Sequence, residues 1–515
     1  MAGLLADLGP VSQFILLALL IVCPVLIAKA RTCTKYTILP AAPIVGRKWK
    51  YEPRWLTRYR FVPSGWDITR EGWDKHRDTA FTMLRPDSNI TVLPLRYVDE
   101  LQHVDSHRLH PIEALSNDML GTYTGLSILT NSHLSFSAVQ KRFTPKLPQT
   151  LPRLVDELAY SLPHIIGPCR TWTPIALNDV MTRVISHLTA RTWVGRDLAR
   201  NEEWHTANLE TTASVFTLAV ALKLLPAFLQ PVVAPLLPMK GKLGRGLRRV
   251  RAFLVPLIEE RKALGEGDER PDDMIQWMLD AAEGEERDTV NLATRYVYAA
   301  IGSLFTVSAA LVDCVYDLAA YPEHLAPLRE EVERVLKEDG GWQKGTAAKL
   351  EMMDSFMKES QRVNAPGPIS FKRVVKEQMT LSDGLVLPKD TYIAVVNSGC
   401  IGREDEPFDG FRYAQKQPGQ SSSKARQSLY TSTDREHISF GQGRHACPGR
   451  FVAAVEIKLV FAEMLMRYDV SFAENGDMSS GPEKRPKNLH LLELGFTDPS
   501  AKVYIRERTD AAAST

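Results

Sequence analysis

The sequence FGQGRHACPGR, at residues 440–450, decides how the rest of the chain is interpreted. It places Cys447 in a glycine-rich turn just before residues 451–467, whose pattern predicts an amphipathic helix. The dipole of that helix, nearby cations and above all a bound metal favour a thiolate at Cys447, and a thiolate can ligate iron. The glycines leave room for a flat macrocycle against the backbone. The alternative is a buried structural cysteine, which is the usual role of a single cysteine.

The composition is that of an ordinary globular protein. The chain has 515 residues, 44% hydrophobic and 24% charged, and its formal net charge is +2. This balance predicts neither a nucleic-acid partner nor an acidic substrate. The six cysteines are scattered without a CxxC pair. Their pattern argues against a disulfide framework or a zinc site and favours a reducing compartment.

The N-terminus carries a membrane signature. No charged residue occurs between Asp7 and Lys29, and residues 14–28 read FILLALLIVCPVLIA. A helix over the 21 uncharged residues between Asp7 and Lys29 reaches about 30 Å, the thickness of a bilayer core. We therefore predict a transmembrane anchor over residues 1–30. A cleaved signal peptide is the alternative, because residues 28–30 read AKA, but the segment lacks a basic n-region.

Basic residues follow the apolar segment, which predicts its orientation. They are Lys29, Arg31, Lys35, Arg47, Lys48 and Lys50. The positive-inside rule then leaves the rest of the chain in the cytosol. Two prolines make residues 31–45 a stiff connector.

Beyond the connector we expect one large domain over residues 46–505, because no internal repeat or long linker interrupts it. Helical patterning dominates, and residues 290–320 predict a long helix through the core. Strand signals cluster at residues 372–396. The fold class is therefore mostly α with a minor β part, followed by a disordered tail at residues 506–515.

Residues 213–240 are strongly apolar but contain Lys223 and four prolines. We expect a set of short core helices here. The alternative is a surface loop that dips into the same membrane as the anchor.

The segment around Cys447 resembles the haem-binding signature of the cytochrome P-450 superfamily, F-x-x-G-x-R-x-C-x-G. The residues in register are Phe440, Gly443, Cys447 and Gly449. His445 occupies the usual arginine position, with Arg444 beside it, and either can donate to a haem propionate. The resemblance implies a P-450 fold and haem b with Cys447 as its axial thiolate ligand.

The sequence ESQR places Glu359 and Arg362 on one helical face, and EVER at residues 331–334 has the same spacing. Taken alone, both patterns are typical of a solvated surface ion pair. The resemblance selects the first, because the superfamily's E-x-x-R helix precedes the strand cluster and the cysteine loop. Arg412 resembles the third member of that buried charge network. These three residues are expected to shape the haem pocket.

Spacing back from Pro322 aligns Thr306 with the oxygen-activating threonine of the family. A mid-helix threonine otherwise bonds to its own backbone. The acid that should precede it is replaced by Phe305. Arg373 matches a family position that often reaches a haem propionate; a solvated arginine at a strand edge is the alternative.

The resemblance implies a monooxygenase of the endoplasmic reticulum membrane that oxidises an apolar small molecule by hydroxylation or related steps. Electrons would come from NADPH-cytochrome P-450 reductase, with cytochrome b5 as an optional second donor. Residues 97–101 and 143–145 resemble the fungal branch of ent-kaurene oxidase, which implies a terpenoid or other secondary-metabolite substrate. Two alternatives remain: a haem-thiolate isomerase or dehydratase without a reductase, which the missing acid would permit, and a non-catalytic haem-binding sensor or carrier.

Overall fold

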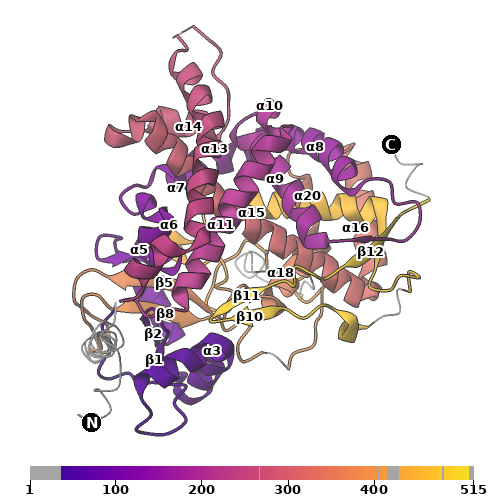
Figure 1. Ribbon diagram of the computed structural model, residues 1–515. Helices are drawn as coiled ribbons and strands as arrows, with labels where there is room; N and C mark the ends of the chain where they lie inside the picture. The colour runs from indigo at the N-terminus through magenta and orange to yellow at the C-terminus, as the bar shows by residue number, and fades with distance from the viewer. Residues whose placement is uncertain (1–35, 266, 404, 415–427, 478–480, 510–515) are drawn as a thin grey trace, which may run out of the picture.

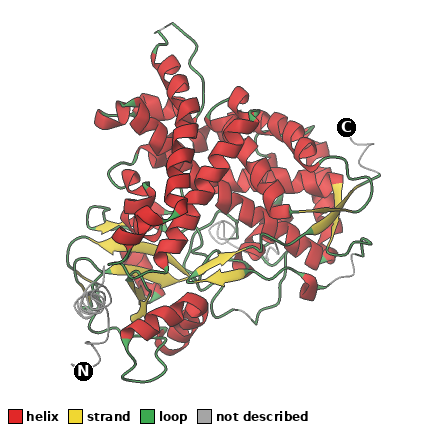
Figure 2. Cartoon of the chain, viewed as in Figure 1, coloured by secondary structure: helices red, strands yellow, loops and turns green. Residues whose placement is uncertain are grey.

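The computed structural model describes residues 36–509, apart from residues 266, 404, 415–427 and 478–480. Helices make up most of this chain, and the strands gather mainly on one side (Figures 1 and 2). The prediction of a mostly helical fold with a minor β part is confirmed. The anchor predicted at residues 1–30 lies outside the described residues.

The largest sheet has five strands in the order β1-β2-β8-β5-β3. Its strands are β1 (Phe81–Leu84), β2 (Asn89–Leu93), β8 (Tyr392–Val396), β5 (Ile369–Val375) and β3 (Leu109–His110). β2 and β8 are parallel, whereas the other neighbours are antiparallel. All residues of β1, β2 and β8 are buried, because α3 (Arg54–His76) and other elements cover the sheet (Figure 1). β5 and β8 come from the predicted strand cluster.

The smaller sheets lie around the helices. They are formed by β4 (Thr173–Ile175), β12 (Val503–Glu507) and β9 (Tyr468–Ser471), by β6 (Met379–Thr380) and β7 (Val386–Leu387), and by β10 (Leu489–Leu491) and β11 (Leu494–Phe496).

The central helix is α15 (Thr289–Ala320), which matches the predicted core helix within one residue. It begins where Asp288 accepts a hydrogen bond from the backbone N–H of Asn291 at 2.8 Å. It ends before Pro322, because a residue preceding proline disfavours helical backbone. In the described part of the chain, α15 alone is long and apolar enough to cross a membrane. Its mostly buried surface makes it a core helix instead.

The other longer helices surround α15. They are α5 (Pro111–Asp118), α8 (Thr144–Ile166), α9 (Leu177–Trp193), α11 (Glu202–Lys223), α13 (Pro238–Lys262), α14 (Met274–Ala281), α16 (Leu325–Asp339), α18 (Glu351–Val363) and α20 (Arg450–Arg467). Short helices are α4 (Val98–Leu101), α6 (Gly121–Thr124), α7 (Leu134–Ala138), α10 (Arg196–Ala199), α12 (Gln230–Val233) and α17 (Thr346–Lys349). α9, α13, α18 and α20 contact α15 directly. The cysteine loop and the central helix are therefore parts of one core.

Both ends of the predicted domain differ from the expected boundaries. Leu39, Ala42 and Val45 are buried, and the backbone N–H of Val45 donates to the carbonyl of Thr82 at 3.0 Å. The described part of the connector thus packs on the sheet. At the other end β12 runs to Glu507, so the strand extends two residues into the range predicted as tail.

Residues 213–240 form the end of the long helix α11, the short helix α12 and the start of the long helix α13, so the expectation of a set of short helices holds only for the part between Lys223 and Pro238. Lys223 is buried and forms ion pairs with carboxylates. Val232 and Leu236 are exposed. Membrane contact through this segment stays a prediction.

Candidate active site

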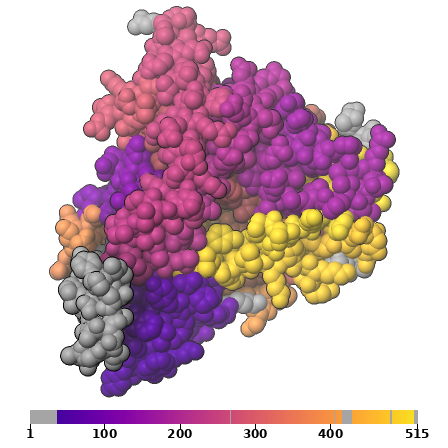
Figure 3. Space-filling model, in the orientation of Figure 1, coloured from indigo at the N-terminus to yellow at the C-terminus, as the bar shows by residue number. Residues whose placement is uncertain are grey.

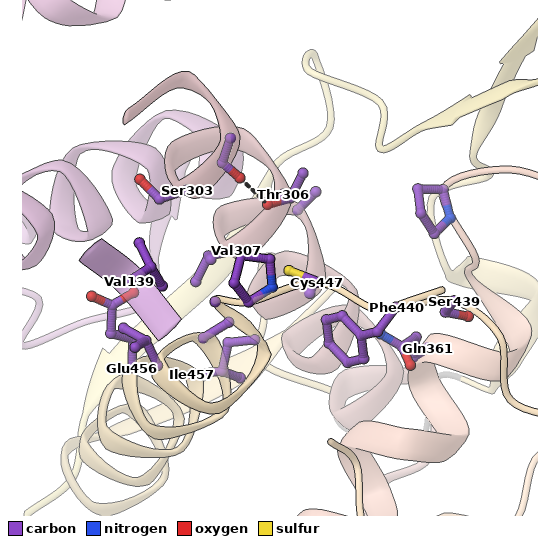
Figure 4. Close-up of a pocket in the computed structure, with 18 of the residues that line it drawn as sticks. Val139, Ser303, Thr306, Val307, Gln361, Ser439, Phe440, Cys447, Glu456 and Ile457 are labelled. Atoms are coloured by element: carbon purple, nitrogen blue, oxygen red, sulfur yellow. Dashed lines mark hydrogen bonds between the residues drawn. The ribbon is translucent and has the colours of Figure 1, made fainter. Parts of the chain in front are cut away.

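Cys447 borders a cavity of about 520 Å³ between α15, α18 and α20. Its backbone N–H donates to the carbonyl of Phe440 at 2.8 Å, which closes the glycine-rich turn. Gly443 has a φ of +74°, and a Cβ there would lie 2.6 Å from Gln102, so packing requires glycine at this position. Gly449 has open space around its Cα and lines the cavity. Figure 4 shows the Cys447 sulfur among the cavity side chains.

The electrostatic surroundings of Cys447 act on its thiol in two opposite directions. Burial raises the pKa of the thiol, whereas backbone N–H groups at the start of α20 and the Arg450 guanidinium lower it. The helix N-terminus and the nearby cation thus favour the thiolate, as predicted, but burial outweighs them in the chain alone. A metal bound to the sulfur would supply the missing stabilisation.

A second cavity of about 640 Å³ adjoins the first. The residues that line both are Leu115, Phe136, Pro366, Ser439, His445 and Pro448. Arg373 is buried in its wall rather than solvated at a strand edge. Its Nη1 donates to the carbonyl of Lys372 at 2.8 Å, whereas its Nη2 has no hydrogen-bond partner in the described part of the chain. His445 Nε2 is likewise buried without a hydrogen-bond partner there.

These two unsatisfied nitrogens fit the carboxylates of a haem. Burial lowers the pKa of Arg373 to about 10, which leaves it cationic at neutral pH. Burial and the positive charge of Arg373 lower the pKa of His445 to about 4, so His445 is a neutral donor in one tautomer. A buried donor that lacks a partner is costly, and a carboxylate would satisfy it.

Arg444 also lines the second cavity, but its guanidinium forms an ion pair with Asp105 at 2.7 Å, and both side chains are more than half exposed. Of the two residues considered as propionate donors, His445 therefore suits the role and Arg444 does not. Phe440 lines the first cavity and packs edge-on against Tyr430, with ring centroids 5.4 Å apart.

Thr306 lies on the α15 side of the cavity (Figure 4). Its Oγ1 donates to the carbonyl of Gly302 at 2.7 Å, which leaves the oxygen lone pairs available to a ligand. Ser303 lines the same wall and bonds to its own helix backbone. Phe305 is outside the cavity lining and packs edge-on against Phe216 of α11, with centroids 5.3 Å apart. The residue that replaces the expected acid thus serves helix packing.

The sequence-based reasoning missed Asp313, seven residues beyond Thr306 and therefore on the same face of α15. Arg485 donates hydrogen bonds to Asp313 Oδ1 at 2.9 Å and to Asp317 Oδ1 at 2.5 Å. Burial raises the pKa of Asp313 to about 8, although Arg485 opposes this effect. Glu456 of α20 also lines the cavity, and burial raises its pKa to about 8 (Figure 4). The cavity wall therefore holds two carboxyl groups that are mainly protonated at neutral pH. In the sequence, only the seven-residue spacing from Thr306 indicated that Asp313 could face the same site.

The side chains of Glu359, Arg362 and Arg412 meet near the C-terminal end of α18. Arg362 donates twice to Glu359, from Nη2 at 2.7 Å and from Nε at 2.9 Å. Arg412 Nε donates to the same carboxylate at 3.2 Å, and the backbone N–H of Asp409 does so at 3.1 Å. This network fastens Arg403 and residues 406–412 to the helix that supplies Ser360 and Gln361 to the cavity.

The interpretation of Glu331 and Arg334 as a solvated surface ion pair is wrong. Glu331 is buried, and its carboxylate accepts hydrogen bonds from the backbone N–H groups of Met352 and Met353. Arg334 is exposed and pairs with Glu338 instead.

Comparison with known proteins gives a consistent result. A family model described as cytochrome P-450 matches residues 142–495. The cytochrome P-450 monooxygenase olcJ of Penicillium canescens is 35% identical, with 92% of this chain and 89% of that protein covered. Ent-kaurene oxidase of Gibberella intermedia is 34% identical, with coverages of 91% and 88%. The cytochrome P-450 monooxygenase AtmP of Aspergillus flavus is 35% identical, with coverages of 90% and 89%.

The fold is similar to that of a solved structure, the retinoic acid-bound cyanobacterial CYP120A1, with a TM-score of 0.66. The sequence identity is 16%, and the alignment covers 92% of this chain and all of that one. At this identity the likeness concerns the fold alone.

Proposed function

The chain belongs to the cytochrome P-450 family and is an oxygen-incorporating oxidoreductase, and we propose that its substrate is a terpenoid-type intermediate of secondary metabolism. The observation that carries the proposal is the position of Cys447 at an apolar cavity that continues to Arg373 and His445. The relatives support the substrate class, since one is named ent-kaurene oxidase.

The family implies a haem with thiolate ligation, and we propose haem b. Cys447 would hold the iron, while Arg373 and His445 would hold the carboxylates. When bound, the haem supplies the oxidation chemistry, and thiolate ligation favours O–O cleavage. The open space at Gly449 and the ring of Phe440 suit a flat ligand.

The chain's own residues bind the substrate and move protons. Aromatic and aliphatic side chains line the cavity and exclude water from an apolar ligand: Leu129, Phe136, Val139, Phe143, Trp193 and Phe496. The Thr306 hydroxyl accepts a hydrogen bond from a water or substrate hydroxyl and orients it. Phe305 cannot relay a proton. Asp313 lines the same cavity with a protonated carboxyl group, which can supply the proton instead.

A monooxygenase of this family needs a redox partner and binds a small molecule. We propose NADPH-cytochrome P-450 reductase as the partner, with cytochrome b5 as an optional second donor.

The single-pass anchor and the endoplasmic reticulum membrane belong to the same proposal and rest on the apolar sequence at residues 8–28. Removing residues 1–30 should release much of the protein from membranes, as fractionation would show. Protease protection of the domain inside sealed microsomes would contradict the cytosolic orientation.

The cofactor assignment is tested by Cys447→Ala beside Cys314→Ala, which removes a buried thiol elsewhere in the core. The CO complex of the reduced protein should show the red-shifted Soret band of thiolate ligation in the wild type and in C314A. The band should be absent in C447A, and an unchanged band there would reject Cys447 as the ligand.

The reaction is tested by reductase-dependent consumption of NADPH and oxygen with a diterpene hydrocarbon. Thr306→Ala should raise the peroxide released per NADPH. It should also lower the product yield by about 10²-fold or more, which is the size of a general acid step. Turnover without a reductase would favour the isomerase or dehydratase instead. Product unchanged in T306A would exclude proton delivery through this hydroxyl.

A further inference from the structure

Six ionisable side chains, four of them buried and two partly buried, form a cluster between parts of the chain that are far apart in sequence. They are the cations Arg85, Lys223 and Lys372 and the carboxylates Asp87, Asp118 and Glu493. They come from the β1–β2 turn, α11, β5, the end of α5 and the β10–β11 turn. Figure 3 shows that the indigo, magenta and yellow segments that contribute to it adjoin on one face of the molecule.

The cluster is held by short ion pairs. Lys372 Nζ lies 2.6 Å from Asp118 Oδ2, and Arg85 Nη1 lies 2.8 Å from Asp118 Oδ1. Lys223 Nζ lies 3.4 Å from Glu493 Oε1. Three cations balance three carboxylates, so the cluster is neutral and each charge is compensated.

Two carboxylate oxygens of this cluster, Asp87 Oδ1 and Glu493 Oε2, are buried and have no hydrogen-bond partner among the described residues. Of these two residues, only Glu493 lines a cavity. Glu493 meets Arg85, Lys223 and Lys372 through its other oxygen, Oε1. Burial opposes ionisation of Glu493, but the three cations lower its pKa to about 2. The carboxylate is therefore ionised, and its free oxygen requires a donor that the protein does not supply.

Glu493 also borders empty space. It lines the second cavity together with Asp118 and Lys372, and that cavity adjoins the one at Cys447. Arg85, Lys223 and Asp87 are absent from the lining of both cavities. Asp118, Lys372 and Glu493 thus form a polar wall of the second cavity, in which Arg373 and His445 would hold the haem carboxylates. The apolar side chains of Leu115, Phe136 and Pro366 line both this cavity and the one at Cys447.

The chemistry of this wall selects one kind of ligand group. An amine would donate to Glu493 but would lie next to the ammonium of Lys372. A carboxylate or ketone would accept from Lys372 but would leave Glu493 Oε2 without a donor. A hydroxyl does both, because it donates through its hydrogen and accepts through its oxygen.

We propose that the polar wall binds a hydroxyl group at the end of the substrate remote from the oxidised carbon, so that the substrate is an alcohol already oxygenated by an earlier reaction. This inference rests on the proposed function, since it concerns the substrate of the same site. Glu493 is the residue that determines the preference for an alcohol, through Oε2.

The chain offers a matched pair of variants. Glu493→Gln and Asp87→Asn both replace a buried carboxylate of the cluster by an amide and remove the same charge. Only Glu493 of the two lines the cavity. The ligands are dehydroabietinol, its methyl ether and the hydrocarbon dehydroabietane, which keep one diterpene skeleton and differ in donating and accepting a hydrogen bond. Their dissociation constants are measured by equilibrium dialysis with the full-length, haem-loaded protein.

Wild type and D87N should bind the alcohol about tenfold more tightly than the ether or the hydrocarbon, the effect of one hydrogen bond to a charged group. E493Q should bind all three within about twofold of one another. Equal binding of the three ligands by the wild type would overturn the inference but leave the terpenoid proposal intact. Loss of the preference in D87N as well would show that the charge of the cluster, not Glu493 Oε2, sets it.

If none of the diterpenes binds, the terpenoid proposal fails, and the polar wall is tested apart from that skeleton with dodecanol, its methyl ether and dodecane. Preference for dodecanol would support the wall as a hydroxyl site, and equal binding would overturn it. Should E493Q fold poorly, a crystal structure of the wild type with bound alcohol decides instead. A hydroxyl placed away from Glu493 Oε2 would overturn the inference.

Discussion

The two Glu-x-x-Arg sequences of this protein have the same spacing and different partners. In α18, Glu359 and Arg362 face each other and are buried. In α16, Glu331 turns inward to the backbone of α18, while Arg334 lies outside with Glu338. Local spacing puts two side chains on one face of a helix, but what that face meets decides their role.

Both motifs act on the same helix. No side chain at Leu350 caps the start of α18, and the Glu331 carboxylate from α16 accepts the N–H groups of Met352 and Met353 at 2.7 and 2.9 Å. Glu359 and Arg362, near the other end, fasten the helix to Arg403 and residues 406–412. The helix that borders the cavity is thus fixed at both ends by a glutamate.

The largest effect is expected from Glu359→Ala, which leaves the Arg362 guanidinium buried without its partner. Stranding one member of a buried pair costs about 3–5 kcal/mol. The free energy of unfolding, from urea denaturation followed by circular dichroism, should fall by that amount, and haem retention should fall with it. Glu333→Ala, at an exposed position of α16, is the control and should change stability by less than about 0.5 kcal/mol. A cost for E359A below that of E331A would reverse the ranking of the two motifs.

Glu331→Ala should cost about 1–3 kcal/mol, the penalty of leaving buried N–H groups without an acceptor. The loss should be local to the start of α18. Hydrogen exchange at the amides of Met352 and Met353 should accelerate, whereas the amides near Glu359 should keep their protection. Stability equal to that of the E333A control would mean that the cap contributes nothing.

The two glutamates should also respond to pH in opposite directions. Burial raises the pKa of Glu359, but Arg362 more than offsets this effect and the net pKa is lowered. Burial raises the pKa of Glu331, and the N–H groups of Met352 and Met353 offset this only in part. Ionised Glu359 therefore contributes to the free energy of unfolding above about pH 4.5, and this contribution is lost as the pH falls through its folded-state pKa. Ionisation of Glu331 instead lowers stability as the pH rises from about 4.5 through its folded-state pKa.

The measurement is urea denaturation from pH 4 to pH 7 of the wild type, E359Q and E331Q. The destabilisation caused by E359Q should grow with pH, and that caused by E331Q should shrink. Slopes of the same sign would contradict the assignment of one glutamate to a guanidinium and the other to backbone N–H groups.

The comparison also shows how far the sequence could predict this structure. The long apolar pattern of residues 290–320 predicted α15 within one residue, because a core helix carries its signal in its own composition. The strand cluster and the turn around Cys447 were predicted for the same local reason. Glu331 was misjudged because its partners lie 21 and 22 positions away, on a helix whose start has no cap in its own sequence.

The site was predictable only where one motif specified it. Cys447 and Thr306 could be assigned from residues near them, whereas the choice between Arg444 and His445 depended on Asp105, which lies far away in sequence. The polar wall could not be predicted at all, since Asp118 and Glu493 meet only after folding.

The smallest effect is expected from Arg334→Ala, the counterpart in α16 of Arg362→Ala in α18. Arg334 is 58% exposed and its partner Glu338 is 52% exposed, so water screens the pair and the side-chain entropy of both residues opposes it. An exposed i,i+4 pair contributes about 0.3–0.5 kcal/mol, and the free energy of unfolding should fall by no more than this. Raising the salt concentration should remove even that difference between R334A and the wild type. R362A, measured under the same conditions, should keep its full cost of about 3–5 kcal/mol in salt, because its partner Glu359 is shielded from ions. A salt-resistant loss above about 1 kcal/mol in R334A would mean that the second motif also holds a buried pair, and the contrast between the two helices would no longer stand.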